Sequence, residues 1–467
     1  MAMFLKSMGV PHVLRIKNSF TLSVSPTVYK FIRDMTSISE DPHTMVKRIM
    51  WKKYLQAFIA KTQQAKTSKS TGYNSVICDV FAGPGSIGDQ WNEDIDSYGT
   101  PLIALRVAFD FFIAKNKLAN KFNHATAGEY ASPRKDFIDD YRVKLFFNEN
   151  DLENYKKLRS NVGKMFRCYG IDALIFSDND VDTKGKRLDK VIFGSNDTNI
   201  SVCCHVTCGE FEEFTPPVLS EYDRMVTFID PFEFSQIPMA KVAEFAGQNR
   251  EVFINLMSSF MNRFFKTKID VIAKVFGFER SYLENLHSQA DAHRIDFIVE
   301  QYSAALKLRS SSEFPVLTFE MRNKINARLY HLLFMSTHIE GVKAMKESMN
   351  RGAQEPDAFT LSDHKILLKN IPLNLGNQQK SEDVAESIFT KFQGQTVNLK
   401  EIENFIWLDT PFIYRTEPLK ILQKTGQIVY VVDAVTGKDQ VRIGCFPDKT
   451  KAGVARIWKI TFAKQEE

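Results

Sequence analysis

Short apolar runs alternate with longer amphipathic stretches along the first half of the chain. The runs lie at residues 76–80, 142–147, 202–207, 225–229 and 251–256 and have the length of buried strands. A stretch that starts at His43 places Met45, Leu55 and Phe58 on one side of a helix, and Thr100-Pro101 is a typical helix start. Strands that alternate with helices predict an α/β fold with a mostly parallel sheet.

Two further apolar runs lie close together at residues 315–320 and 329–335. The eight residues between them are too few for a crossover helix, so the two strands should pair antiparallel. A helix at residues 339–349 follows. The last strand of the sheet is therefore predicted to be antiparallel.

Polar stretches interrupt the pattern at residues 116–140 and 178–199. Both are interpreted as surface excursions. Long loops often act as lids or recognition segments, and they are also tolerated as plain insertions. The sequence leaves both alternatives open.

The last quarter of the chain has a different pattern. Residues 351–380 are polar, with Gly and Pro, and are interpreted as a linker. Three short helices are predicted at residues 381–392, 399–408 and 416–424, and two strands at 427–432 and near 441–445. This order predicts a winged helix-turn-helix domain at 381–467. Such domains bind nucleic acid or dock proteins, and Lys420, Lys424 and Arg442 are the candidate contacts to nucleic acid.

The first apolar run breaks into the glycine-rich loop Phe81-Ala82-Gly83-Pro84-Gly85. Glycine tolerates positive φ and a ligand pressed against its backbone, so this loop is a candidate site for a nucleotide-like ligand. An ordinary turn is the alternative interpretation. A nucleotide hydrolase is disfavoured because no Gly-Lys-Ser/Thr follows the loop.

Acidic residues recur where the predicted strands end. Asp79 and Glu149 end the first and second runs, Glu210 follows the third, and Asp230 follows the fourth. Parallel sheets bind ligands beyond the carboxyl ends of their strands, so these acids could share one ligand-binding rim, with Glu149 contacting ribose hydroxyls. Taken singly, each acid could instead cap a helix.

The net charge is only +5, but the amino-terminal part is locally basic. Residues 1–33 and 43–78 contain no acid, so residues 1–40 are interpreted as a basic extension, with an organelle transit peptide as the alternative. Lys47 and Lys52 on the first predicted helix are further candidate contacts to nucleic acid.

Six cysteines in 467 residues indicate reduced thiols and a cytoplasmic location. No metal site is expected at Cys203-Cys204-His205, because adjacent residues on a strand point to opposite faces. No apolar run reaches the ~18 residues that a membrane helix needs, so no membrane partner is expected.

Five segments, read in order, are similar to the three-Cys-motif partner family (TcmP). They are His43-Thr44 with Lys47, Asp79-Val80-Phe81-Ala82-Gly83-Pro84-Gly85, the segment Gly99-Thr100-Pro101-Leu102-Ile103-Ala104-Leu105, Phe228-Ile229-Asp230-Pro231-Phe232, and Phe334-Met335-Ser336-Thr337-His338 ahead of Ala344-Met345-Lys346. The resemblance spans residues 41–351 and continues through the carboxy-terminal domain. It implies a Rossmann-like class I methyltransferase-type domain at 41–350 and a three-Cys-motif protein as a partner.

By the same resemblance, the cofactor is S-adenosylmethionine. Its methionyl part would be lined by Asp79, Phe81, Gly83 and Gly85, its ribose would contact Glu149, and its adenine would lie near Glu210.

The substrate side of the site would be formed by Asp230, Pro231 and Phe232, the catalytic candidates. Amino-directed nucleic-acid methyltransferases usually carry a second proline in this motif, and this chain has Phe232 there. His43 and His338 are candidate rim residues, although a histidine beside apolar neighbours is more often structural.

Two functions are therefore expected from the sequence. The first is an S-adenosylmethionine-dependent methyltransferase that acts on nucleic acid. The second is a non-catalytic adaptor or regulator that keeps the methyltransferase-like fold and binds DNA or a protein partner through its winged helix.

Overall fold

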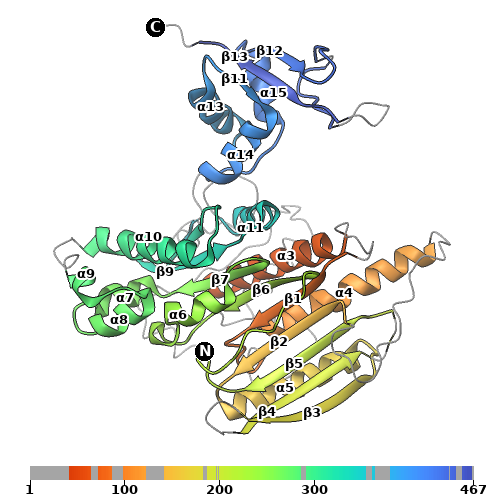
Figure 1. Ribbon diagram of the computed structural model, residues 1–467, viewed down its shortest axis with the longest axis vertical. Helices are drawn as coiled ribbons and strands as arrows, with labels where there is room; N and C mark the ends of the chain where they lie inside the picture. Colours follow the sequence, from red (N-terminus) through yellow and green to blue (C-terminus); the bar gives the residue numbers. More distant parts are fainter. Residues whose placement is uncertain are drawn as a thin grey trace, which may run out of the picture. The chain divides into compact units, whose positions relative to one another are not determined.

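The computed structural model describes residues 42–64, 72–86, 98–121, 141–181, 187–195, 197, 199–284, 291–353, 360–362, 379–440, 442–448 and 455–464 (Figure 1). The basic extension predicted for residues 1–40 lies outside these ranges. So do residues 122–140 of the first predicted insertion and residues 354–359 and 363–378 of the predicted linker.

A ten-stranded sheet forms the centre of the fold, in the order β10-β8-β9-β7-β6-β1-β2-β5-β4-β3. Its strands are β1 (Asn74–Asp79), β2 (Val143–Glu149), β3 (Ala173–Val181), β4 (Arg187–Ser195), β5 (Val202–Cys208), β6 (Asp223–Ile229), β7 (Arg250–Leu256), β8 (Leu317–Arg322), β9 (Arg328–Met335) and β10 (Thr360–Ser362). Strands β5, β2, β1, β6 and β7 are joined by parallel pairs, whereas β9 runs antiparallel to both of its neighbours. The predicted α/β class, the mostly parallel sheet and the antiparallel pair are confirmed.

Helices cover both faces of this sheet (Figure 1). One face packs against α3 (Pro42–Gln64), α4 (Thr100–Lys121), α5 (Leu152–Cys168) and α11 (Ile339–Gly352). The other face packs against α6 (Met239–Val242), α7 (Ser258–Phe264), α8 (Ile269–Phe276), α9 (Arg280–Glu284), α10 (Asp291–Ser310) and the short helices η3 (Phe234–Gln236) and η4 (Ala243–Phe245). Ile77 of β1 belongs to the first core, and its neighbours Val76 and Cys78 belong to the second. A strand buried on both faces has to be apolar throughout, which explains its continuous apolar run.

The predicted surface excursion at residues 178–199 is wrong over most of its length. Strands β3 and β4 form an antiparallel hairpin there, and β4 pairs antiparallel with β5 at the edge of the sheet. The hairpin is stable because Val191 and Phe193 are buried, and the Phe193 ring stacks on Phe166 of α5 at 6.0 Å. The predicted linker also needs correction, since β10 lies within it and pairs with β8.

The carboxy-terminal domain contains α13 (Ser381–Phe392), β11 (Thr396–Asn398), α14 (Leu399–Asp409), α15 (Glu417–Lys424), β12 (Ile428–Asp433) and β13 (Trp458–Phe462). Its strands form a small antiparallel sheet in the order β11-β13-β12. The three helices agree closely with those predicted. The strand predicted near 441–445 is wrong, because residues 442–445 form a bend and a turn, and β13 pairs with β12 instead.

The buried ammonium of Lys346 links α11 to this domain. Its Nζ donates hydrogen bonds to the carbonyl oxygens of Ile406 (2.6 Å), Trp407 (3.1 Å) and Thr410 at the end of α14. A helix end leaves its last carbonyls without intrahelical partners, so one lysine binds two of them and the carbonyl of Thr410 just after the helix.

Among the described helices, none combines the length and apolar character needed to cross a membrane.

Candidate functional site

The acidic strand ends lie next to one another. Strands β5, β2, β1 and β6 are consecutive and parallel, so their carboxyl ends share one edge of the sheet, here called the rim. Asp79 and Glu149 end β1 and β2, whereas Glu210 and Asp230 follow β5 and β6. The predicted clustering of these four acids at one edge is confirmed.

The glycine loop after β1 is fixed from several sides. Gly83 and Gly85 both have positive φ (60° and 79°). Asn161 of α5 donates to the Pro84 carbonyl at 3.0 Å, and the Gly99 amide donates to the Gly85 carbonyl at 2.8 Å. The loop is therefore a preorganised turn at the rim.

The two glycines have different reasons to be glycine. A Cβ on Gly85 would lie 2.8 Å from Leu158 Cδ1, whereas nothing lies within 4 Å of a Cβ on Gly83. We expect Gly85→Ala to destabilise the fold by about 2–4 kcal/mol, through left-handed backbone strain plus overpacking. The matched variant Gly83→Ala should cost about 1–2 kcal/mol, from backbone strain alone. Urea unfolding of both variants tests this, and equal losses would contradict it.

Asp79 is a buried acid, and in the part of the chain described only one of its two carboxylate oxygens accepts a side-chain hydrogen bond. The Thr100 hydroxyl donates to its Oδ2 at 2.6 Å, so this side chain binds the acid across the rim. Its Oδ1 is buried and has no hydrogen-bond partner among the described residues. Burial raises the pKa of Asp79 to about 7; hydrogen bonding from Thr100 and the Phe81 backbone opposes this rise, and the nearby charges of Asp230 and Glu149 reinforce it.

Glu149 holds the loop. Its Oε2 accepts from the Gly83 amide at 2.7 Å and its Oε1 accepts from the Asp151 amide at 2.9 Å. Its side chain is fully engaged, and the residue is only 1% exposed. Each carboxylate oxygen already accepts from one backbone amide, and the predicted ribose contact stays a prediction.

Asp230 accepts hydrogen bonds from two side chains that are distant from it in the sequence. Lys47 of α3 donates to its Oδ2, and Asn255 at the end of β7 donates to its Oδ1 at 2.7 Å. Lys47 was predicted to contact nucleic acid from an open helix face. Its side chain is only 11% exposed, so it belongs to the rim instead.

The remaining substrate-side and cofactor-side candidates differ in exposure. Pro231 is buried, and Phe232 is 65% exposed, which leaves its ring free to contact a ligand. Phe81 is half-buried against the ring of Phe211 at 5.1 Å. Glu210 is exposed and accepts from Asn150 at 3.3 Å.

Two rim amides were missed. Besides Asn255, Asn148 lies one residue before Glu149 and donates to the Gly209 carbonyl at 2.9 Å. The side-chain oxygens of both asparagines are buried and lack partners among the described residues. A polar residue in the last two positions of an apolar strand was the available signal for both.

Some candidates lie away from the rim. His338 lies at the opposite, amino-terminal edge of the sheet, because it follows the antiparallel strand β9, so its predicted rim position is wrong. Lys52 of α3 is half-buried. Lys420, Lys424 and Arg442 lie in the carboxy-terminal domain, where Lys424 and Arg442 are exposed and Lys420 pairs with Glu417.

No group of three or more His, Cys, Asp or Glu side chains within the described ranges is arranged to hold a metal ion. Cys203 contacts His205 at 3.9 Å, whereas Cys204 packs into the core under α5. The expectation that adjacent cysteines face opposite ways is confirmed.

Comparison of the sequence with protein-family models and with curated proteins found no match.

Proposed function

We propose that the protein is an S-adenosylmethionine-dependent methyltransferase of class I type, related to the three-Cys-motif partner family and acting on nucleic acid. The observation that carries the proposal is where the strand order reverses. From β1 the chain proceeds to β2 and β5 on one side, and then to β6 and β7 on the other. Doubly wound sheets bind ligands at this reversal, and Asp79 and Asp230 stand on either side of it.

The residues at the rim fit the methionyl end of the cofactor. The unpartnered Oδ1 of Asp79 is an acceptor for an ammonium group, and the bare backbone of Gly83 leaves room for close approach. Glu149 acts one step away, by holding the Gly83 amide in place. The cofactor, when bound, supplies an activated methyl group, so the protein mainly has to position donor and acceptor.

The acceptor side is formed by Asp230 and Phe232. An exposed ring next to an acid suits a nucleobase, because the ring can stack on it while the carboxylate accepts from its amine. The carboxy-terminal domain has the helix and strand order of a winged helix, which would supply Lys424 and Arg442 as phosphate contacts. A three-Cys-motif protein is the partner that the family resemblance suggests.

Cofactor binding should depend on the ionisation of Asp79. Because its pKa is raised to about 7, Asp79 is mostly neutral at pH 6 and mostly charged at pH 7.5. S-adenosylmethionine affinity, measured by calorimetry, should therefore rise roughly eightfold from pH 6 to pH 7.5. Asp79→Asn should bind more weakly and lose this pH dependence.

Stability provides the control for that variant. A carboxyl whose pKa is raised by folding contributes stability below its ordinary pKa, and this contribution is lost as the pH rises through 7. Asp79→Asn should therefore melt no lower than the wild type at pH 7.5. A wild type that binds no S-adenosylmethionine, or a folded Asp79→Asn that binds it normally, would contradict the proposed cofactor site.

A second candidate function is favoured by the state of Asp230. Both of its oxygens are already engaged by Lys47 and Asn255, as expected of a structural acid rather than one waiting for an amine. We therefore retain the adaptor, a methyltransferase-like protein without catalysis that binds DNA or a partner through its carboxy-terminal domain. It predicts that changing Lys420 and Lys424 abolishes function in cells while changing Asp230 does not.

A further inference from the structure

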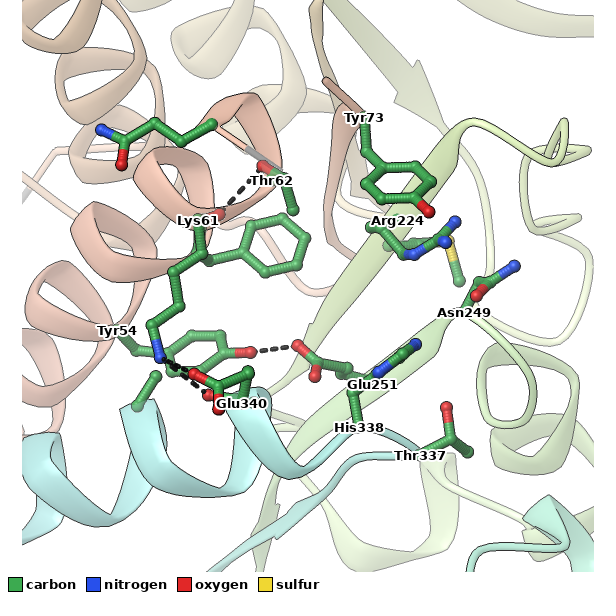
Figure 2. Close-up of a pocket in the computed structure, with 15 residues that line it drawn as sticks. Tyr54, Lys61, Thr62, Tyr73, Arg224, Asn249, Glu251, Thr337, His338 and Glu340 are labelled. Carbon is green, nitrogen blue, oxygen red and sulfur yellow. Dashed lines mark hydrogen bonds and ion pairs between the residues drawn. The ribbon is translucent and has the colours of Figure 1, made fainter. Parts of the chain in front are cut away.

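A cavity of about 430 Å³ lies at the amino-terminal edge of the sheet, at the opposite end of the strands from the rim (Figure 2). Its walls come from the second half of α3, the residue before β1, the first residues of β6 and β7, and the start of α11. Small-molecule sites in proteins commonly have volumes of roughly 300–1,000 Å³, so the cavity has the size of a ligand site.

One side of this cavity is apolar. Tyr54 and Phe58 of α3, Met225 of β6 and Ala344 of α11 line it, and all four are buried. The Tyr54 hydroxyl donates to Glu251, so the polar end of this ring is already paired. The wall therefore offers ring faces and methyl groups to an apolar body.

The opposite side carries a fixed cation. Arg224 lies against the Tyr73 ring, with 3.7 Å between the guanidinium carbon and the ring centroid (Figure 2). Its Nη1 donates to the carbonyl oxygens of Glu221 (3.0 Å) and Asp223 (2.8 Å), so the side chain is held in position. Within the described part of the chain, Arg224 forms no ion pair with a carboxylate. Its guanidinium is thus held in a fixed orientation, with the Asp223 carboxylate as a nearby charge rather than an ion-pair partner.

The other charged groups at the cavity are already engaged. Lys61 pairs with Glu340 at 2.8 Å. The buried carboxyl of Glu251 accepts from Tyr54 and from Ser336, and burial raises its pKa to about 7. Gly341 is necessary for this packing, because a Cβ there would lie 1.9 Å from Glu251 Oε1.

Two neutral groups add to the polar side. The Asn249 carboxamide and the His338 imidazole line the cavity together with Arg224 (Figure 2). In the residues that the structure describes, neither side chain makes a hydrogen bond. The cavity therefore combines an apolar wall with one oriented cation and two polar side chains that make no hydrogen bond among the described residues.

We propose that this cavity binds a small organic anion, an aromatic carboxylic acid whose ring lies against Tyr54 and Phe58 and whose carboxylate is bound by Arg224. A planar guanidinium recognises a carboxylate through two parallel hydrogen bonds. Asn249 and His338 complete the shell of the carboxylate. This site is separate from the rim and does not depend on the function proposed for it.

The test uses the full-length protein with benzoate, phenylacetate and 3-phenylpropionate, each compared with its uncharged carboxamide. Saturation-transfer NMR titrations to 10 mM should show at least one acid binding about tenfold more tightly than its amide. Arg224→Gln should abolish this preference, and Arg224→Lys should keep part of it, since the charge remains without the planar fork. Arg159→Gln, an exposed arginine on α5, is the matched control and should behave as the wild type.

A second variant guards against misfolding of Arg224→Gln, which loses two backbone contacts. His338→Leu replaces the imidazole with an apolar side chain of similar size and removes a donor, so it should weaken acid binding severalfold and leave amide binding unchanged. Thermal melting establishes that each variant is folded. The proposal is overturned if no acid binds better than its amide, or if a folded Arg224→Gln keeps the preference.

Discussion

Asp230→Ala is expected to lower kcat/KM for methyl transfer to nucleic acid by at least about 10²-fold, and to leave S-adenosylmethionine affinity within about threefold. The reason is that Asp230 lies across the strand reversal from Asp79 and is the proposed contact to the methyl acceptor. Transfer of tritiated methyl groups to tRNA, single-stranded DNA and duplex DNA measures this effect.

The ion pair with Lys47 complicates the interpretation of that variant. Removing the carboxylate leaves a largely buried ammonium without its partner, which is itself destabilising. The double variant Lys47→Met/Asp230→Asn removes both charges and should regain most of the stability lost by either single change. It should not regain activity, if Asp230 contacts the acceptor.

The outcomes separate the two candidate functions. Loss of methyl transfer in the stable double variant supports the enzyme. Unchanged function in cells for Asp230→Ala, together with loss for the pair Lys420→Ala and Lys424→Ala, supports the adaptor.

Trp51→Ala is expected to lower the free energy of unfolding by about 3–5 kcal/mol. Trp51 is fully buried under α3, with its ring centroid 5.0 Å from that of Phe228 and 6.1 Å from that of Phe253. Truncation would leave a cavity between the helix and two central strands. Urea unfolding followed by circular dichroism measures the loss.

A matched aromatic truncation shows whether burial is the cause. Phe232→Ala removes a ring that is 65% exposed, so stability should change by less than about 0.5 kcal/mol. Methyl transfer by the folded protein should fall more in Phe232→Ala than in Trp51→Ala, because Phe232 lies beside Asp230. A stable Trp51→Ala would show that α3 is not anchored as described.

The sequence predicted the central sheet well because buried parallel strands are apolar throughout and end abruptly. The acids at those ends were visible for the same reason. The hairpin of β3 and β4 was missed because the apolar run of β4 is short, from Val191 to Phe193, and follows a long polar stretch.

Side-chain pairing across the rim could not be predicted. Lys47 precedes Asp230 by 183 residues, and a lysine on a helix normally indicates a solvated face. Glu149 was correctly placed at a strand end, but its bond to the Gly83 amide depends on how the loop closes. The cavity at the other edge combines residues such as Tyr54, Arg224 and His338 from separate elements, and no motif joins them.

Helix α3 touches both ends of the sheet. Its first turns hold Lys47 against Asp230, its middle holds Tyr54 against Glu251, and its last turn holds Thr62 against Ser75. Lys47 and Lys61 are separated by roughly 21 Å along the helix at 1.5 Å per residue. A single rigid helix therefore extends from the rim to the cavity. An aromatic acid that binds in the cavity and shifts α3 along its axis would change the ion pair between Lys47 and Asp230. Linkage then requires that the acid and a ligand at the rim change each other's affinity by the same factor.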